Sequence, residues 1–282
     1  MSTYGIQNEL SAEDYARFAD FTGRLALLCR RGRAVSDVAV LVPEAAVWAC
    51  YNPPDGGLFP HYIKCNPDAI QIDHVFRESC HQLSAHQRDY EIISENLLAK
   101  AGTGNGQLRL EGYGFSILLL PEARMLHEST LDKLEEFLQE GGHAAFIGSL
   151  PFQNPETGVD PGMTSRTEAL LSSWDDQIYH LPGIQKMDEL IGWMEERVPP
   201  VVKWEGASAI RFLHRSEDVR EIFLLANPGL ENIAGGFSSR YKGQVSVWDP
   251  ETGRIEDLGK FKAGENIQVR IPAESAKFLI IE

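Results

Sequence analysis

Two kinds of hydrophobic pattern divide the chain near residue 200. In the first part, short apolar runs alternate with amphipathic segments, and short links join them. Short apolar runs are typical of strands buried in a parallel sheet, and apolar residues at helical spacing indicate the helices that cover it. The pattern predicts strands at 37–43, 89–95, 116–120 and 144–148, and helices at 68–85, 128–140, 164–173 and 187–197. This alternation predicts an α/β domain over residues 37–200.

From Val201 onward the apolar runs are short and alternating, and Gly, Pro, Asn or Asp separates them. Alternation with a period of two predicts strands with one buried face, and close turns predict antiparallel neighbours. Residues 201–282 are therefore expected to form a small antiparallel β-sandwich. The predicted fold class is α/β plus all-β.

Residues 1–36 form an N-terminal segment with a predicted helix at 11–33. Ser11 and Asp14 have the spacing of a capping box, and Gly32 is a suitable end. Three arginines between 30 and 33 are expected in the last turn, where cations suit the helix dipole. The helix has a substantial apolar face with no partner nearby in the sequence, at Tyr15, Phe18, Ala19, Phe21, Leu25, Leu28 and Cys29.

Residues 115–151 form the clearest strand–helix–strand passage. Its helix has an apolar stripe that suits a sheet, and Gly141-Gly142 is expected to form its C-cap. Gly148–Pro151 follows the second strand, at the edge where open α/β sheets usually bind ligands. Upstream, a glycine-rich turn at 102–106 leads into a predicted hairpin-like pair of strands.

The charge, the apolar runs and the cysteines of the chain exclude several classes of function. The chain has 26 basic and 41 acidic residues, a formal net charge of −15, which argues against a nucleic-acid partner. No apolar stretch approaches the roughly 18 residues of a membrane span, and the N-terminus lacks the pattern of a signal peptide. Four cysteines without a C-x-x-C pair are expected to be reduced thiols. These features predict a cytoplasmic protein that binds no membrane.

The motifs of common cofactor and catalytic sites are missing from the sequence. No strand leads into G-x-G-x-x-G, and neither a P-loop nor G-x-S-x-G is present. A cluster of possible metal ligands has the spacing of helix packing residues: His74, Cys80, His81 and His86. We therefore predict no cofactor, no metal and no catalytic residue within this chain.

Trp174, Asp175 and Asp176 are the best candidates for contacts with a sugar. An aromatic face beside carboxylates suits a pyranose ring. The alternative is a helix end with one buried tryptophan.

Four stretches carry a resemblance to a known family. They are 15–48; 90–98 with 106–151; 210–229; and 245–258, which contains W-D-P-E-T-G. Their order resembles the C-terminal half of α-L-rhamnosidase-like glycoside hydrolases of family 106. More loosely, it is similar to the region that follows the barrel in family 42 β-galactosidases. The resemblance covers nearly the whole chain.

The resemblance implies a flavodoxin-like domain, of the type also found in class I amidotransferases, followed by a β-sandwich. It also implies that the catalytic carboxylates belong to an upstream barrel, of which 1–36 resembles only the end. A barrel needs about 200 residues or more, so this chain would be an accessory region whose partner is the barrel, a carbohydrate or a second copy of itself.

Two alternatives stay open. One is a carbohydrate-binding module that uses tryptophan platforms, with candidates Trp48, Trp174, Trp193, Trp204 and Trp248. The other is an independent amidotransferase- or hydrolase-like enzyme, in which His127 or His143 would serve a nucleophile at a strained turn.

Overall fold

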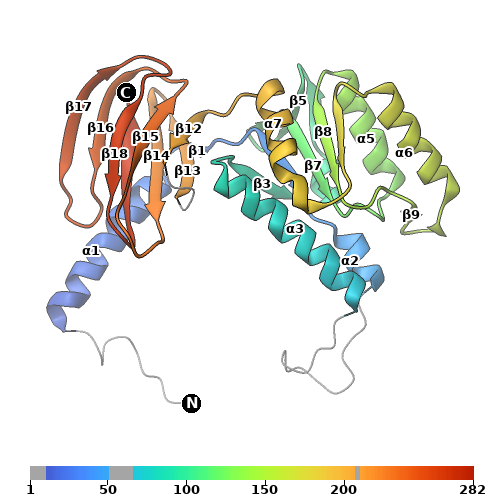
Figure 1. The fold of residues 1–282 in the computed structure, drawn as a ribbon, viewed down its shortest axis with the longest axis horizontal. Helices are drawn as coiled ribbons and strands as arrows, with labels where there is room; N and C mark the ends of the chain where they lie inside the picture. The colour runs from blue at the N-terminus through green and yellow to red at the C-terminus, as the bar shows by residue number, and fades with distance from the viewer. Residues whose placement is uncertain (1–10, 51–65, 207–209) are drawn as a thin grey trace. The chain divides into compact units, whose positions relative to one another are not determined.

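The computed structural model describes residues 11–50, 66–206 and 210–282 (Figure 1). The chain divides into two compact units. The α/β unit is Ser36–Pro199, and the β unit joins the described residues up to Val35 with Pro200–Glu282. No helix in the described part of the chain is long and apolar enough to cross a membrane.

The α/β unit is built on a five-stranded parallel sheet. Its strands run in the order β3-β2-β7-β8-β11, which is 2-1-3-4-5 in chain order and is one of the two common doubly wound orders. The strand order reverses between β2 and β7. The strands are β2 (Val38–Leu41), β3 (Tyr90–Ile93), β7 (Ile117–Pro121), β8 (His143–Ile147) and β11 (Ile178–Leu181).

Helices cover both faces of this sheet (Figure 1). Successive side chains of a strand point to opposite faces, so Ala39 and Leu41 join one core while Val38 and Val40 join the other. The first core includes α4 (Glu95–Leu98), α5 (Glu128–Gln139) and α6 (Pro161–Ser173), and the second includes α3 (Pro67–Ala85) and α7 (Met187–Arg197). The predicted strands and helices of this unit are confirmed, and β11, α2 (Glu44–Cys50) and α4 are additional elements.

The segment after α4 differs from the predicted hairpin-like pair, because it forms a small antiparallel sheet of three strands. These are β4 (Gly102–Gly104), β5 (Gln107–Leu110) and β6 (Tyr113–Phe115). A short antiparallel pair, β9 (Gln153–Asn154) and β10 (Gly158–Val159), precedes α6. A 3-10 turn at Ile184–Lys186 leads into α7.

Gly141 and Gly142 end α5 as the sequence predicts. Gly141 has φ +90°, and the Gly142 N–H donates to the Phe137 carbonyl at 2.9 Å. A Cβ atom on Gly142 would lie 2.1 Å from the buried Phe137 ring. The two glycines therefore provide both the turn and the close approach.

The β unit contains two antiparallel sheets that share a core. The six-stranded sheet has the order β1-β13-β14-β19-β16-β17, and the three-stranded sheet has the order β12-β15-β18. Phe223 and Leu279 from the first meet Phe237 and Val269 from the second. The strands are β1 (Arg33–Ala34), β12 (Val202–Glu205), β13 (Arg211–Glu217), β14 (Arg220–Asn227), β15 (Ile233–Ser239), β16 (Gly243–Trp248), β17 (Ile255–Phe261), β18 (Ile267–Ile271) and β19 (Ser275–Ile281).

Helix α1 (Ala12–Cys29) packs on the other face of the six-stranded sheet, where Leu28 joins Phe278 and Ile280. The Ser11 cap is confirmed, because its hydroxyl accepts the Asp14 N–H at 3.1 Å.

The predicted end of this helix is wrong, since no basic residue lies in its last turn. The chain turns instead at Gly32, whose φ is +57°, and Arg33 begins β1 opposite Ser216. A Cβ on Gly32 would lie 2.1 Å from the Ser216 carbonyl oxygen, so pairing with β13 ends the helix early.

Candidate functional sites

The predicted sugar-contacting residues lie in the turn between α6 and β11. Trp174 is the C-cap of α6, and its half-buried side chain packs against the core. Asp175 and Asp176 are exposed, and the Asp176 carbonyl accepts the Arg197 Nε–H at 2.9 Å. One aromatic ring and two exposed carboxylates thus share this turn, with the ring turned to the core.

The predicted cluster of His and Cys on α3 is spread over different surroundings. Cys80 is buried in the core, and burial raises the pKa of its thiol. His81 faces Glu78 at 3.7 Å, and His86 faces Asp188 at 3.5 Å. Across the described ranges, no group of three or more His, Cys, Asp or Glu side chains is placed to hold a metal ion. Cys29, Cys50 and Cys80 are free thiols, and Cys65 lies outside the described residues.

The turn after β7 holds a strained and buried carboxylate. Glu122 has φ +45°, a left-handed conformation that costs a non-glycine residue of order 1–3 kcal/mol. Its N–H donates to the Ile147 carbonyl at 2.7 Å, so pairing with β8 holds the turn. At this sharp strand-to-helix turn a hydrolase would need a thiol or hydroxyl nucleophile. The residue here is a glutamate.

Neighbouring groups pair with the Glu122 carboxylate and enclose it. Arg124 donates to its Oε2 atom at 2.7 Å, and the two side chains are only 16% and 6% exposed. Arg124 also lies 3.5 Å from Asp68 on α3. Gly148, with φ +82°, closes the other side, because a Cβ there would lie 2.4 Å from Glu122 Oε1. Strain, burial and pairing at this edge of the sheet indicate a structural lock between β7 and β8.

Next along the same edge, Glu95 connects α4 with the start of α5. Its carboxylate accepts the His127 N–H at 2.9 Å and the Thr130 hydroxyl. The His127 ring lies 3.1 Å from the same carboxylate and is half exposed. A carboxylate beside imidazole is half of a catalytic arrangement, yet here it also caps the first turn of α5.

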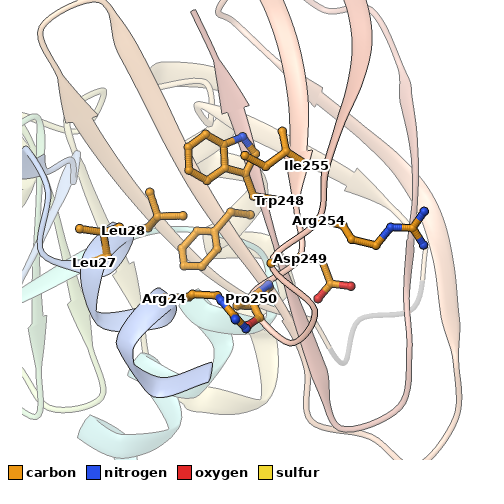
Figure 2. Close-up of a pocket in the computed structure, with 10 residues that line it drawn as sticks. Arg24, Leu27, Leu28, Trp248, Asp249, Pro250, Arg254 and Ile255 are labelled. Carbon is orange, nitrogen blue, oxygen red and sulfur yellow. The ribbon is translucent and has the colours of Figure 1, made fainter. Parts of the chain in front are cut away.

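In the β unit, a hollow of about 200 Å³ lies between α1 and the β16–β17 turn (Figure 2). Leu28, Trp248 and Phe278 form much of its apolar wall. Arg24 donates to the carbonyl oxygens of Pro250 and Glu251 at 3.1 and 3.0 Å. Its guanidinium therefore ties α1 to the turn.

The W-D-P-E-T-G sequence forms this turn for a local reason. Asp249 Oδ1 accepts the N–H groups of Glu251 and Thr252 at 2.9 and 3.3 Å. The Gly253 N–H closes the turn on the Asp249 carbonyl at 2.8 Å, and Gly253 adopts φ +74°. An aspartate that caps its own turn, followed by proline and later glycine, is the expected chemistry of such a loop. Figure 2 shows the Asp249 and Arg254 side chains directed away from the apolar wall.

The first half of α1 lacks a cover within the described residues. Tyr15 and Phe18 are 47% and 51% exposed, whereas Leu28 in the second half is 3% exposed. Every residue from Ser11 to Asp20 is exposed. Tyr15 and Phe18 lie one turn apart on the same face and form an apolar patch, here named the α1 patch, of the kind that marks contact sites.

No protein-family model matches the chain. A Formosa agariphila protein, provisionally named a beta-glucuronidase, is 24% identical over 245 residues, which are 85% of this chain and 18% of that protein. The chain therefore spans about a fifth of the length of this curated relative.

Two solved structures share its fold. The rhamnosidase of Novosphingobium sp. PP1Y matches 96% of this chain with 24% of its own, at 20% identity and a TM-score of 0.64. The beta-galactosidase of Bacillus circulans sp. alkalophilus matches 96% of this chain with 45% of its own, at 14% identity and a TM-score of 0.65. The chain thus has a fold that recurs as part of larger glycoside hydrolases.

Proposed function

We propose that this chain is an accessory, non-catalytic region of a glycoside hydrolase that acts on α-L-rhamnosides or related glycosides. The observation that carries the proposal is the asymmetry of the matches. Nearly all of this chain corresponds to 24% of a rhamnosidase and 18% of a protein named as a beta-glucuronidase. The catalytic carboxylates would then lie in the remainder of such an enzyme.

In this proposal the α/β unit is a flavodoxin-like domain and the β unit is a small sandwich. The strand order 2-1-3-4-5 and the pair of antiparallel sheets with a common core support that assignment. The lock formed by Glu122, Arg124 and Gly148 fits a scaffold, because its two buried charges pair with each other, while the buried Arg124 Nε–H has no hydrogen-bond partner among the described residues.

The α1 patch is the surface proposed to contact the catalytic part. Exposed Tyr15 and Phe18 would bury their apolar area there, and Arg24 would hold the helix in place. Burial of such side chains stabilises an interface by roughly 25 cal/mol per Å² of apolar surface, before the costs of association.

The test combines two assays. The chain alone is incubated with nitrophenyl α-L-rhamnoside, β-glucuronide and β-galactoside, and no release of nitrophenol is expected. Any glycosidase catalytic domain found encoded beside this chain is then assayed with and without the chain, and the chain should raise the Tm and kcat of that domain.

A double variant, Tyr15→Ser and Phe18→Ser, should lose that effect. Val219→Ser is the matched control, since Val219 is 85% exposed at the β13–β14 turn, outside the α1 patch. Turnover by the chain alone, abolished by Glu122→Gln, would overturn the proposal in favour of an enzyme on the α/β unit.

A further inference from the structure

A second hollow of the β unit is lined by residues from both of its sheets. It has a volume of about 870 Å³ and joins a neighbouring hollow of about 620 Å³ through Ala234, Arg270 and Lys277. Together they form what we name the inter-sheet groove. Its polar wall consists of Asp249, Arg254, Glu256, Gln268, Arg270 and Lys277.

Lys277 lies on the core face of the six-stranded sheet. It is paired with Leu225 in the sheet register and alternates with Leu279 and Ile281, all three of which belong to the shared core. The ammonium lies 2.7 Å from the Asp249 carboxylate, and the two side chains are 14% and 19% exposed. The apolar core thus ends in a charged pair at the floor of the groove.

Burial of the Lys277–Asp249 pair costs free energy. Removal of two charges from water carries a desolvation penalty that apolar side chains of similar size would avoid. Burial raises the Asp249 pKa, but hydrogen bonds from Lys277, Thr252 and Glu251 outweigh that effect, so its pKa is lowered and it stays ionised.

Two arginines without partners also line the groove. Arg270 alternates with Val269 and Ile271, which belong to the core, so its side chain leaves the outer face of β18 and lines the groove at its rim. Arg254 and Arg270 are exposed, and within the described residues neither side chain has a hydrogen bond or an ion pair. The groove thus has three cations against two carboxylates, in a chain where acids outnumber bases by 41 to 26. Such a local reversal of charge attracts an anion.

The other lining groups narrow the class of anion. Carboxylates, an amide and an ammonium offer both donors and acceptors, which suit hydroxyl groups. A phosphate dianion would meet repulsion from Asp249 and Glu256. The described lining residues include no aromatic ring, so a neutral sugar would lack a stacking platform. A guanidinium matches a carboxylate in geometry.

We propose that the inter-sheet groove binds a carboxylate-bearing saccharide, with Arg254 and Arg270 on its carboxylates and the Lys277–Asp249 floor and Gln268 on its hydroxyls. The choice of a saccharide rests on the proposed function. The choice of an anion rests on the groove itself. The region would then hold an acidic glycan near the enzyme that cleaves it.

The experiment measures binding of trigalacturonic acid to the whole chain by calorimetry, with its trimethyl ester as the neutral counterpart. The acid should bind at least about tenfold more tightly than the ester, and its affinity should fall as NaCl rises from about 0.05 to 0.3 M. The double variant Arg254→Gln and Arg270→Gln should weaken binding at least about tenfold.

Arg211→Gln is the control, because Arg211 is an exposed arginine of the same unit outside the groove. Unchanged Tm values would show that the variants fold. Equal binding of acid and ester, equal loss in the control, or binding of inorganic phosphate as tight as that of the acid would overturn the proposal. None of these outcomes depends on hydrolysis or on the catalytic domain, so failure here is distinct from failure of the accessory role.

Discussion

Each unit contains a nearly buried ion pair, and the two pairs differ in what surrounds them. In the α/β unit, Glu122 and Arg124 are enclosed by Gly148 and Asp68. In the β unit, Lys277 and Asp249 form the floor of a groove whose other cations have no partner in the described chain. The carboxyl edge of a parallel sheet is the usual place for a ligand, yet here the charged side chains of Glu122 and Arg124 already pair with each other. The position of a residue in the fold therefore indicates where a ligand site can form. Charged side chains without partners indicate where a ligand can still bind.

The two units also differ in how they cover their sheets. Helices cover both faces of the parallel sheet, and β2 and β7 are buried along their whole length. The outer face of the six-stranded sheet carries α1, and only the second half of α1 contacts it. The β unit thus leaves apolar surface for a partner.

The largest expected effect comes from breaking the enclosed pair of the α/β unit. Glu122→Gln keeps the size of the side chain but leaves Arg124 without its close carboxylate. Loss of one partner of a buried pair typically costs about 3–5 kcal/mol, and we expect about 3 kcal/mol in the free energy of unfolding. Urea denaturation followed by far-UV circular dichroism measures it.

Glu168→Gln is the matched control on the same unit, since Glu168 is exposed on α6. It should change the free energy of unfolding by less than about 0.5 kcal/mol. If both variants lose the same small amount, Glu122 is not a structural lock.

The second prediction compares a buried and an exposed leucine of α1. Leu28→Ala removes a side chain that is 3% exposed among Phe278 and Ile280. We expect a loss of about 2 kcal/mol, at the low end for a buried leucine, because this cluster is small. Leu27→Ala, at a residue 59% exposed, should cost less than about 0.5 kcal/mol. Thermal unfolding of both variants gives the comparison, and similar losses would mean that α1 is not held by its buried side.

Much of the α/β unit is readable from sequence because four of the five sheet strands are short apolar runs and the longer helices have apolar residues at helical spacing. The fifth strand, β11, has Tyr and His at its centre and is not predicted. The capping pair Ser11–Asp14 and the glycines after α5 behave as their local chemistry predicts. The predicted end of α1 is wrong because of a contact with a distant part of the sequence. Three arginines favour a longer helix, but Arg33 instead pairs with Ser216 in the antiparallel β1–β13 ladder, which ends the helix earlier.

The candidate sites are harder to read for the same reason. Trp174, Asp175 and Asp176 are adjacent in sequence, so a pattern can find them. The inter-sheet groove joins Arg254 of the β16–β17 turn, Arg270 of β18 and Lys277 of β19, and no spacing along the chain connects them. An alternating strand that places a lysine on its core face, as at Lys277, is the one signal that points there.

The smallest effect is a pH dependence in the α/β unit. Burial lowers the pKa of His143, the positive charge of Arg197 lowers it further, and a hydrogen bond with Ser116 opposes both. The unfolded chain therefore binds a proton at a higher pH than the folded unit does. The stability linked to neutral His143 is fully present above the ordinary pKa of about 6.5 and is lost as the pH falls through that value toward the lowered one.

His143→Gln removes the titrating group, so its unfolding midpoint in urea should fall less between about pH 7 and pH 5 than that of the unsubstituted chain. His81→Gln is the control, because His81 is exposed beside Glu78 on α3. A midpoint that falls equally in all three proteins would show that carboxylates, and not His143, set the acid sensitivity. A flatter profile in His143→Gln alone would place that sensitivity at His143 in the α/β unit.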